Sequence, residues 1–237
     1  MRAIGLDFDR REVAEREVDA PRIAAPGEVL WRVAQVGVCG TDRELAAFRL
    51  GSPPPGRSFL VLGHEAVGQV VEVGPAVRLL RPGDWVAPMI RRPCAPHCAS
   101  CARRRPDLCT TGGYGERGIS GLDGYLGDVA VDPEASLVRI DGALAEVAVL
   151  AEPLSVVEKA IDTAMHYRQE PARTALVIGA GPVGLLAAMA LRLRGLEVSL
   201  HSLEPPEHPR ARLAERAGAR YLARPEPADV VLEATGA

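Results

Sequence analysis

The first part of the chain alternates between apolar and polar positions over short stretches, which is typical of β-strands with one buried face. The pattern is clearest in EVLWRVAQVGVCG, EAVGQVVEVG and GDWVAPMI, and it returns in YLGDVAVD and SLVRI. Glycine and proline separate these stretches, at Gly63, Gly68, Gly74, Pro75, Pro82 and Gly83. The pattern predicts a compact antiparallel β-barrel or sandwich.

The spacing of apolar residues along the chain changes near residue 150. AEPLSVVEKAIDTAM repeats its apolar positions every three to four residues, as a helix does. TALVIGAGPVGLLAAMALRLRG then reads as an apolar strand, a glycine turn and an apolar helix, and LEVSLHS follows as a second strand. We therefore expect an α/β protein with two domains, residues 1–150 and 151–237.

Composition and charge limit the classes of binding partner that the sequence predicts. The chain has 237 residues and a net charge of −3, and its charges of both signs are mixed along the sequence. That distribution gives no reason to expect nucleic acid or a membrane as a partner. The start of the chain lacks the apolar segment of a signal peptide, and no apolar run approaches the roughly 20 residues that span a bilayer. We expect a cytoplasmic protein.

Four of the five cysteines lie in RRPCAPHCASCARRRPDLC, with the spacing C-x3-C-x2-C-x7-C. A reducing compartment favours metal binding over disulfides for such a cluster, and four thiolates match a structural zinc site with no open position. Two alternatives are a surface loop of free thiols and a site in which His97 replaces one thiolate. The predicted ligands, in a lobe spanning residues 91–112, are Cys94, Cys98, Cys101 and Cys109.

A glycine motif near the start of the second domain predicts a dinucleotide site. G-x-G-x-x-G follows an apolar strand and opens a helix that begins near Pro182. The first N–H groups of that helix, at its positive dipole end, suit a pyrophosphate. The motif alone is weak because ordinary strand–helix turns also match it, but here a second strand follows. The predicted cofactor contacts are Gly179, Gly181, Pro182, Val183, Gly184, Ser202 and Thr235.

Two short motifs offer chemistry for a nicotinamide cofactor. GVCGTD contains Cys39, and LVLGHEAVG contains His64 and Glu65. A thiolate, an imidazole and a carboxylate with one exchangeable position form the ligand set of a catalytic zinc. Separately, these residues are as well explained by a buried cysteine, a core histidine and a solvated glutamate. Together they favour zinc, with Glu152 as a further candidate ligand.

These motifs together resemble the zinc-dependent medium-chain alcohol dehydrogenase superfamily over essentially the whole chain. GVCGTD, GHE, RPGDWV, the cysteine lobe and GAGPVG are shared with it, and RRPC, GERGI, LDGY and AEPLSVVEKAI resemble its glucose 1-dehydrogenase branch. The resemblance implies a GroES-like β-barrel catalytic domain followed by a Rossmann doubly wound parallel sheet, truncated here relative to the family. It also implies a homo-oligomer, either a dimer or a tetramer.

The implied reaction is hydride transfer from the C1 hydroxyl of a glucose-like aldose to NADP or NAD, which gives an aldonolactone. The resemblance implies two zinc ions per chain, the catalytic one held by Cys39, His64, Glu65 and Glu152. Thr41 would relay the released proton. The sugar would contact Thr41, Glu116 and Glu152, since carboxylates accept hydrogen bonds from several hydroxyls.

Three departures from the family pattern qualify this interpretation. The lobe has x3 where the superfamily usually has x2, which predicts a one-residue bulge. Ser202 stands where an NAD enzyme carries an aspartate, which favours NADP, with Arg210 or Arg212 near the phosphate and Glu204 close by. Family members also run longer. A polyol or secondary-alcohol dehydrogenase and a non-catalytic zinc-binding remnant are the alternatives.

Overall fold

The structure is a computed structural model that describes residues 1–95 and 97–236. It divides into two compact units, Met1–Glu152 and Pro153–Ala237, which we call the N-terminal and C-terminal units. The helix α3 (Ala151–His166) contains the division. Each unit is described by itself below.

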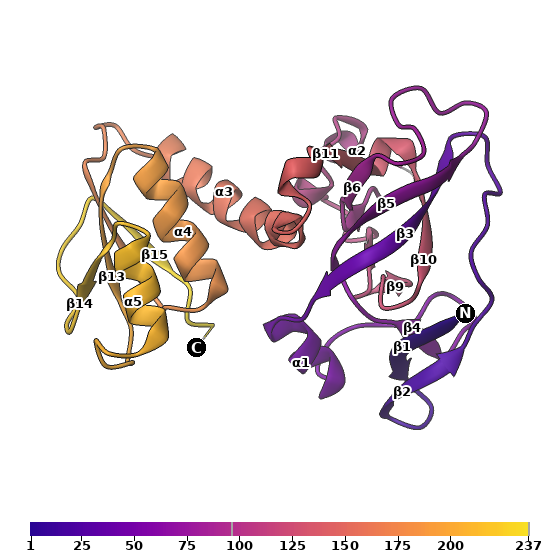
Figure 1. The fold of residues 1–237 in the computed structure, drawn as a ribbon, viewed down its shortest axis with the longest axis horizontal. Helices are drawn as coiled ribbons and strands as arrows, with labels where there is room; N and C mark the ends of the chain where they lie inside the picture. Colours follow the sequence, from indigo (N-terminus) through magenta and orange to yellow (C-terminus); the bar gives the residue numbers. More distant parts are fainter. Residues whose placement is uncertain (96, 237) are drawn as a thin grey trace. The chain divides into compact units, whose positions relative to one another are not determined.

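The N-terminal unit is built from three small sheets (Figure 1). The largest is antiparallel, in the order β10-β3-β5-β6-β11. Its strands are β3 (Glu28–Gly37), β5 (Glu65–Val73), β6 (Trp85–Pro88), β10 (Val129–Pro133) and β11 (Leu137–Ile140). All five were expected from the alternating pattern, and the structure confirms them. Trp31 and Tyr125 are the largest fully buried side chains of this unit's core.

The second sheet, in the order β2-β1-β4, is antiparallel and packs its own apolar clusters. It comprises β1 (Arg2–Asp7), β2 (Glu12–Glu17) and β4 (Phe59–Val61). The third sheet comprises β7 (Arg91–Arg92), β8 (Gly115–Arg117) and β9 (Gly121–Leu122). Here β8 and β9 are parallel, and Gly118 and Gly121 have positive φ of 72° and 73°. The sequence analysis predicted neither strand.

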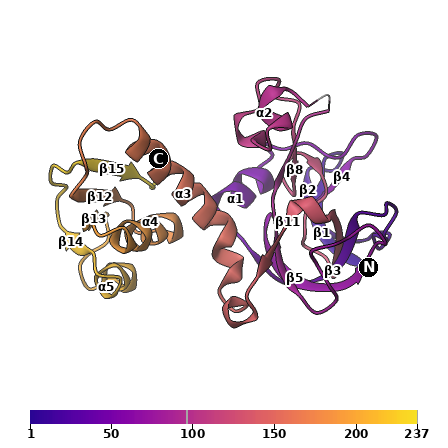
Figure 2. The ribbon, with the colours of Figure 1, turned by 90° about the horizontal axis from the view of Figure 1, so that it is seen from above.

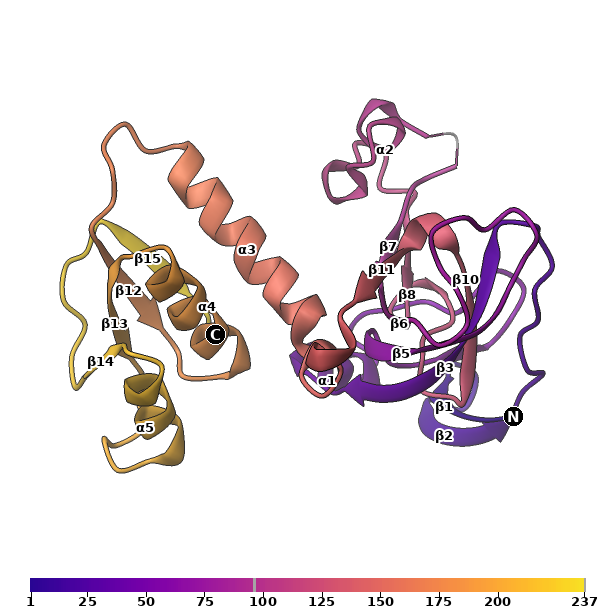
Figure 3. The same ribbon diagram turned by 45° about the horizontal axis from the view of Figure 1, so that its top comes forward.

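Short helices complete the N-terminal unit. The helix α1 (Gly40–Ala46) follows β3, and α2 (Ala99–Ala102) lies in the segment that projects from β7 and β8 in Figure 3. The sequence analysis did not predict α1. Single 3₁₀ turns occur at Pro106–Leu108, Glu134–Ser136, Gly142–Leu144 and Ala148–Leu150.

The C-terminal unit is a parallel sheet with helices against it. Its strands are β12 (Thr174–Ile178), β13 (Glu197–His201), β14 (Arg220–Leu222) and β15 (Val230–Glu233), in the order β14-β13-β12-β15. The helices α4 (Pro182–Leu193) and α5 (Pro209–Arg216) lie on the same face of this sheet (Figures 1 and 2). The α/β class and the strand–helix–strand order are those expected.

Among the residues that the structure describes, no helix has both the length and the apolar character that crossing a membrane requires.

Candidate active site and cofactor site

Two strand ends bring Cys39, His64 and Glu65 together. The antiparallel pairing of β3 with β5 sets Gly37 directly opposite Glu65, so the loop after β3 and the residue before β5 meet. Cys39 Sγ lies 3.2 Å from His64 Nε2. One ligand atom from each of the three residues lies within 4.8 Å of the other two. A thiolate, an imidazole nitrogen and a carboxylate oxygen converging in this way fit a zinc ion.

Asp42 orients this cluster, a role that the sequence analysis missed. Its Oδ2 accepts a hydrogen bond of 2.8 Å from the Cys39 backbone N–H. Its Oδ1 lies 3.6 Å from His64 Nδ1, and among the described residues neither of these two buried atoms has a hydrogen-bond partner. A carboxylate facing Nδ1 turns the Nε2 lone pair toward a metal. The signal was present in GVCGTD, where Cys39 and Asp42 form a capping box at the start of α1.

Thr41 belongs to the same loop and supports Cys39 through its backbone. The Thr41 N–H donates to Cys39 Sγ at 3.3 Å. Burial raises the pKa of the Cys39 thiol, and the hydrogen bonds from Thr41 act in the opposite direction. A bound cation would reverse the effect of burial, because a coordinated thiol is deprotonated.

Glu152 and Glu116 lie in the electrostatic neighbourhood of this cluster. Burial raises the pKa of Glu152; the charges of Glu65 and Glu116 add to the shift, while His64 opposes it. Glu116 lies on β8, where Arg91 contacts its Oε1 from Nε at 2.9 Å and from Nη2 at 2.8 Å. The ligand atoms that lie within 4.8 Å of one another come from Cys39, His64 and Glu65, and neither Glu116 nor Glu152 belongs to that group. The mutual repulsion of the carboxylates still favours a cation in this region.

The four clustered cysteines form a second candidate metal site. Their sulfur atoms all lie within 4.8 Å of one another, and Cys98 Sγ lies 3.9 Å from Cys109 Sγ. A zinc tetrahedron with four sulfur ligands has edges of about 3.8 Å, whereas a disulfide bond is about 2 Å long. All of the cysteines are free thiols. The arrangement therefore fits the predicted structural zinc.

Backbone donors in the lobe favour thiolates. Hydrogen bonds from the backbone of Cys101 and Thr110 lower the pKa of Cys98 to about 5. A side-chain hydrogen bond from Thr111 likewise lowers the pKa of Cys109. The pKa of Cys101 is lowered by a backbone hydrogen bond with Cys94, but burial and the neighbouring sulfur atoms outweigh that effect and raise it to about 12. The Cys101 thiol would lose its proton only when a metal cation binds it.

His97 lies outside the sulfur cluster. Its side chain is exposed, its φ is 55°, and its N–H donates to the Cys94 carbonyl at 2.7 Å. His97 is therefore in the left-handed conformation, and the one-residue bulge predicted from the x3 spacing includes position 96, which lies outside the described residues. Among the described residues the cluster holds cysteines alone, which argues against the His97 alternative.

The three glycines of the second motif have separate roles in the C-terminal unit. Gly179 has a φ of 109°, and a Cβ there would lie 2.8 Å from the Ala234 carbonyl oxygen. A Cβ at Gly184 would lie 1.9 Å from the Gly179 carbonyl oxygen, so this glycine lets α4 pack against the turn. A Cβ at Gly181, which precedes α4, would meet nothing within 4 Å. Open space at a helix N-terminus fits a pyrophosphate.

The remaining predicted cofactor residues lie at the same edge of the sheet, because parallel strands end on one side. Pro182 and Val183 are exposed in the first turn of α4. Ser202 directly follows β13, and Thr235 follows β15, where its backbone N–H donates to Glu233 Oε1 at 2.6 Å. The residues predicted for the cofactor therefore gather at the carboxyl edge, where open α/β sheets bind ligands.

Ser202 belongs to a polar cluster that the sequence did not reveal. Its Oγ lies 2.6 Å from Tyr221 Oη, which donates to the Glu204 carbonyl at 2.6 Å. Arg210 Nη1 lies 3.1 Å from Glu204 Oε1. A hydrogen bond from the Ser202 side chain is the largest cause that lowers the pKa of Glu204, and the hydrogen bond and positive charge of Arg210 lower it further. The arginine that we expected near a 2′-phosphate is thus paired with Glu204.

Two family models together match residues 25–237 of the chain. Residues 25–152 match the family described as Alcohol dehydrogenase GroES-like domain, and residues 145–237 match Glucose dehydrogenase C-terminus. Glucose 1-dehydrogenase from Methanocella arvoryzae is 43% identical over 234 residues, which are 93% of this chain and 65% of the relative. The enzyme of the same name from Thermoproteus tenax is 42% identical over 231 residues, which are 94% of this chain and 65% of the relative. The chain thus spans slightly less than two thirds of these relatives.

Two solved structures of dehydrogenases are similar to this chain in fold and sequence. Glucose dehydrogenase from Haloferax mediterranei, in complex with NADP, Zn and gluconolactone, superposes with a TM-score of 0.87 at 36% identity, over 100% of this chain and 70% of that one. An alcohol dehydrogenase from Thermus sp. ATN1 gives a TM-score of 0.81 at 32% identity, over 100% of this chain and 71% of that one.

Proposed function

Since this chain belongs to the zinc-dependent medium-chain alcohol dehydrogenase family, in its glucose dehydrogenase branch, we propose that it oxidises a glucose-like aldose at C1. The hydride would pass to NADP or NAD, and the product would be an aldonolactone. The observation that carries the proposal is the Cys39–His64–Glu65 cluster with Glu116 and Glu152 in its electrostatic neighbourhood.

Each residue of the cluster has a proposed task. Cys39, His64 and Glu65 would hold the catalytic zinc, with Glu152 as an additional ligand, and Asp42 would fix the His64 ring. When bound, the metal would polarise the C1 oxygen and the nicotinamide would accept the hydride.

The other site residues would act on the sugar. The Thr41 hydroxyl would relay the proton of the C1 hydroxyl, accepting it while passing its own proton on toward solvent. Thr41 lies in the first turn of α1, two residues after Cys39. Glu116 and Glu152 would accept hydrogen bonds from further hydroxyls of the sugar. A simple apolar alcohol would offer those carboxylates no further hydroxyl to bind.

For the cofactor we favour NADP, with use of NAD as well. The residue that follows β13 is Ser202, which carries no charge to repel a 2′-phosphate. Supporting this choice, the Haloferax mediterranei enzyme was solved in complex with NADP. The residues that would hold the dinucleotide are those at the carboxyl edge of the C-terminal sheet.

The cellular setting is part of the proposal. Five free cysteines, four of them arranged for a metal, suit the reducing cytoplasm. The family relationship supports a homo-oligomer, a dimer or a tetramer, which light scattering on a sizing column would test.

One spectrophotometric experiment tests the reaction. Zinc-loaded protein is supplied with NADP⁺ or NAD⁺ and with glucose, galactose, xylose, sorbitol or ethanol, and reduced nicotinamide is followed by its absorbance. We expect turnover with the aldoses, faster with NADP⁺. Higher kcat/KM with sorbitol or ethanol would favour the polyol or secondary-alcohol alternative. The absence of turnover in folded protein carrying both zinc ions would contradict the proposal.

A further inference from the structure

Glu116 is carried by a pair of short strands whose two faces make different contacts. In the antiparallel register of β7 with β8, Arg91 is directly opposite Glu116, and Arg92 is opposite Gly115. Successive side chains of a strand point to opposite faces. Arg91 and Glu116 therefore share one face, while Arg92 and Arg117, the next residue along each strand, share the other.

On the first face, Arg91 holds Glu116 from one side. Its Nε and Nη2 atoms both contact Glu116 Oε1, at 2.9 Å and 2.8 Å. The guanidinium also stacks on the Tyr114 ring, with 4.3 Å from Cζ to the ring centroid. Among the described residues, Glu116 Oε2 has no hydrogen-bond partner. One carboxylate oxygen is thus fixed and the other is left for a donor.

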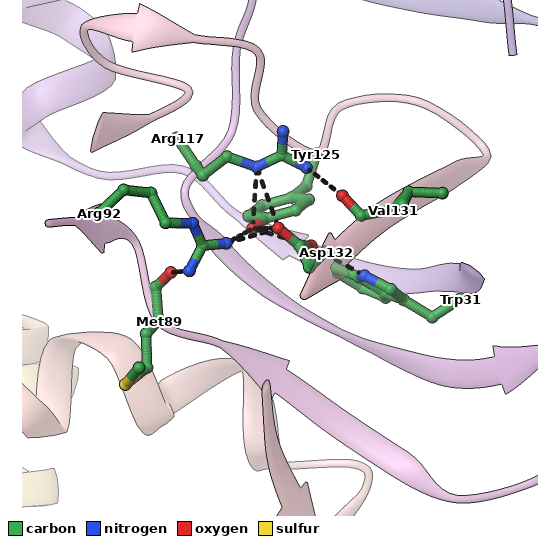
Figure 4. Close-up of polar contacts among 7 residues, drawn as sticks. All are labelled: Trp31, Met89, Arg92, Arg117, Tyr125, Val131 and Asp132. Carbon is green, nitrogen blue, oxygen red and sulfur yellow. Dashed lines mark hydrogen bonds and ion pairs between the residues drawn. The ribbon is translucent and has the colours of Figure 1, made fainter. Parts of the chain in front are cut away.

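On the opposite face, a single buried carboxylate anchors both strands (Figure 4). Asp132, 1% exposed, pairs with Arg92 and lies 3.4 Å from Arg117 Nε. It also accepts hydrogen bonds of 2.9 Å from Trp31 Nε1 and 3.2 Å from the Tyr125 hydroxyl. These donors come from β3, β7, β8 and the loop before β10, so the carboxylate ties the strand pair to the core of the unit.

The two faces together fix the position of Glu116. Arg92 and Arg117 are each adjacent in sequence to a member of the Arg91–Glu116 pair, and both are bound to Asp132. Neither strand can slide without breaking a buried charged contact, and losing one partner of such a contact is strongly destabilising. Arg91 then removes most of the remaining rotational freedom of the Glu116 side chain.

We propose that Arg91 is a positioning residue for sugar recognition, holding Glu116 so that Oε2 accepts a hydrogen bond from a hydroxyl of the aldose. This inference rests on the function proposed above. It also narrows the substrate class. Arg91 Nε and Nη2 both bind Glu116 Oε1, so the charge of Arg91 is balanced by that of Glu116. The pair therefore presents Glu116 Oε2 as a hydrogen-bond acceptor rather than a free positive charge. It therefore selects a neutral aldose over an aldose phosphate.

The test compares Arg91→Met and Glu116→Gln with the double variant. Glucose binding to zinc-loaded protein is measured by calorimetry, which does not depend on turnover, and kcat and KM are measured with glucose and ethanol. We expect each single variant to weaken glucose binding by about tenfold or more, the loss typical of one charge-assisted hydrogen bond. The double variant should bind about as well as Glu116→Gln alone, because Arg91 acts through Glu116. The loss in kcat/KM should be larger with glucose than with ethanol, because ethanol has no further hydroxyl for Glu116 to bind.

A matched control is Arg2→Met, which removes an exposed arginine–glutamate contact of 3.1 Å in the same unit. It should leave glucose binding unchanged. Glucose binding within twofold of wild type in Arg91→Met, full additivity of the two single changes, or tighter binding of glucose 6-phosphate than of glucose by wild type would each overturn the positioning role. If wild-type protein binds no aldose, the proposed function fails and this inference fails with it. If wild type binds glucose and Arg91→Met does so equally well, only the positioning role fails.

Discussion

Gly37→Ala offers a direct test of Glu65 as a zinc ligand. A Cβ at Gly37 would lie 2.2 Å from Glu65 Oε2, 3.0 Å from Glu65 Cβ and 3.2 Å from Glu65 Cδ, which are its three nearest atoms. The largest overlap is with the flexible end of the glutamate, so the carboxylate must move. The carboxylate would have to shift by about 1 Å, and metal–ligand distances tolerate only about 0.2 Å.

The expected result is a selective loss of one zinc ion. Displacing a ligand or its support weakens metal binding by roughly 10–100-fold, which corresponds to about 1.4–2.8 kcal/mol. Zinc affinity is measured by competition with a chromogenic chelator, together with metal analysis at equilibrium. The cysteine lobe should keep its zinc, and circular dichroism should be unchanged.

Gly40→Ala is the matched control. Gly40 lies three residues further along the chain, at the start of α1, and a Cβ there would meet nothing within 4 Å. This variant should bind both zinc ions as wild type does. If Gly37→Ala also keeps both ions at wild-type affinity, Glu65 does not ligate the metal and the reasoning is refuted.

Three further predictions concern the two zinc sites, the cofactor site and the carboxylate of Asp229. Purified protein should carry two zinc ions per chain. Cys39→Ala should lose one ion and keep its melting temperature, while Cys101→Ala should lose the other ion and melt at a lower temperature. Equal destabilisation by the two substitutions would show that the structural site is misassigned. Ser202→Asp should weaken NADP⁺ binding more than NAD⁺ binding by roughly 1–3 kcal/mol, and an unchanged ratio would make Glu204 the ribose ligand. Backbone N–H donors of Arg173 and Thr174 lower the pKa of Asp229 from 3.8 to about 2. Its contribution to stability is therefore present above pH 3.8 and lost as the pH falls through about 2. Asp229→Asn should lower the melting temperature at neutral pH, by a difference that shrinks over that acidic range; a constant difference would contradict this.

Local patterns explain what the sequence could predict. The alternation along β3 and β5 and the apolar period of α3 depend on neighbouring residues, so they can be read without the fold. The cysteine cluster is similar, since its four members lie within sixteen residues. Both groups appeared in the structure where they were expected.

Residues whose roles depend on distant partners could not be predicted. The need for glycine at position 37 comes from Glu65 across the sheet, and Trp31 and Asp132 bond across 101 positions of sequence. Periodicity reports which face of a strand is buried, but it does not give the register between strands. The pairing of Arg91 with Glu116 also depends on that register.

The attachment of the cysteine lobe has a consequence for how it folds. Arg92 and Gly115 are directly paired, so residues 93–114 leave and rejoin the sheet at one point, which a short hairpin turn could also bridge. Among the described residues of this insertion only Cys94 and Cys101 are buried, which is far too little apolar surface to make a core. We therefore expect this insertion to fold only when zinc binds, whereas β7 and β8, which carry it, are held by the contacts of Arg92 and Arg117 with Asp132. In a zinc-starved cell the insertion would open first and expose a protease-sensitive loop on an otherwise folded unit.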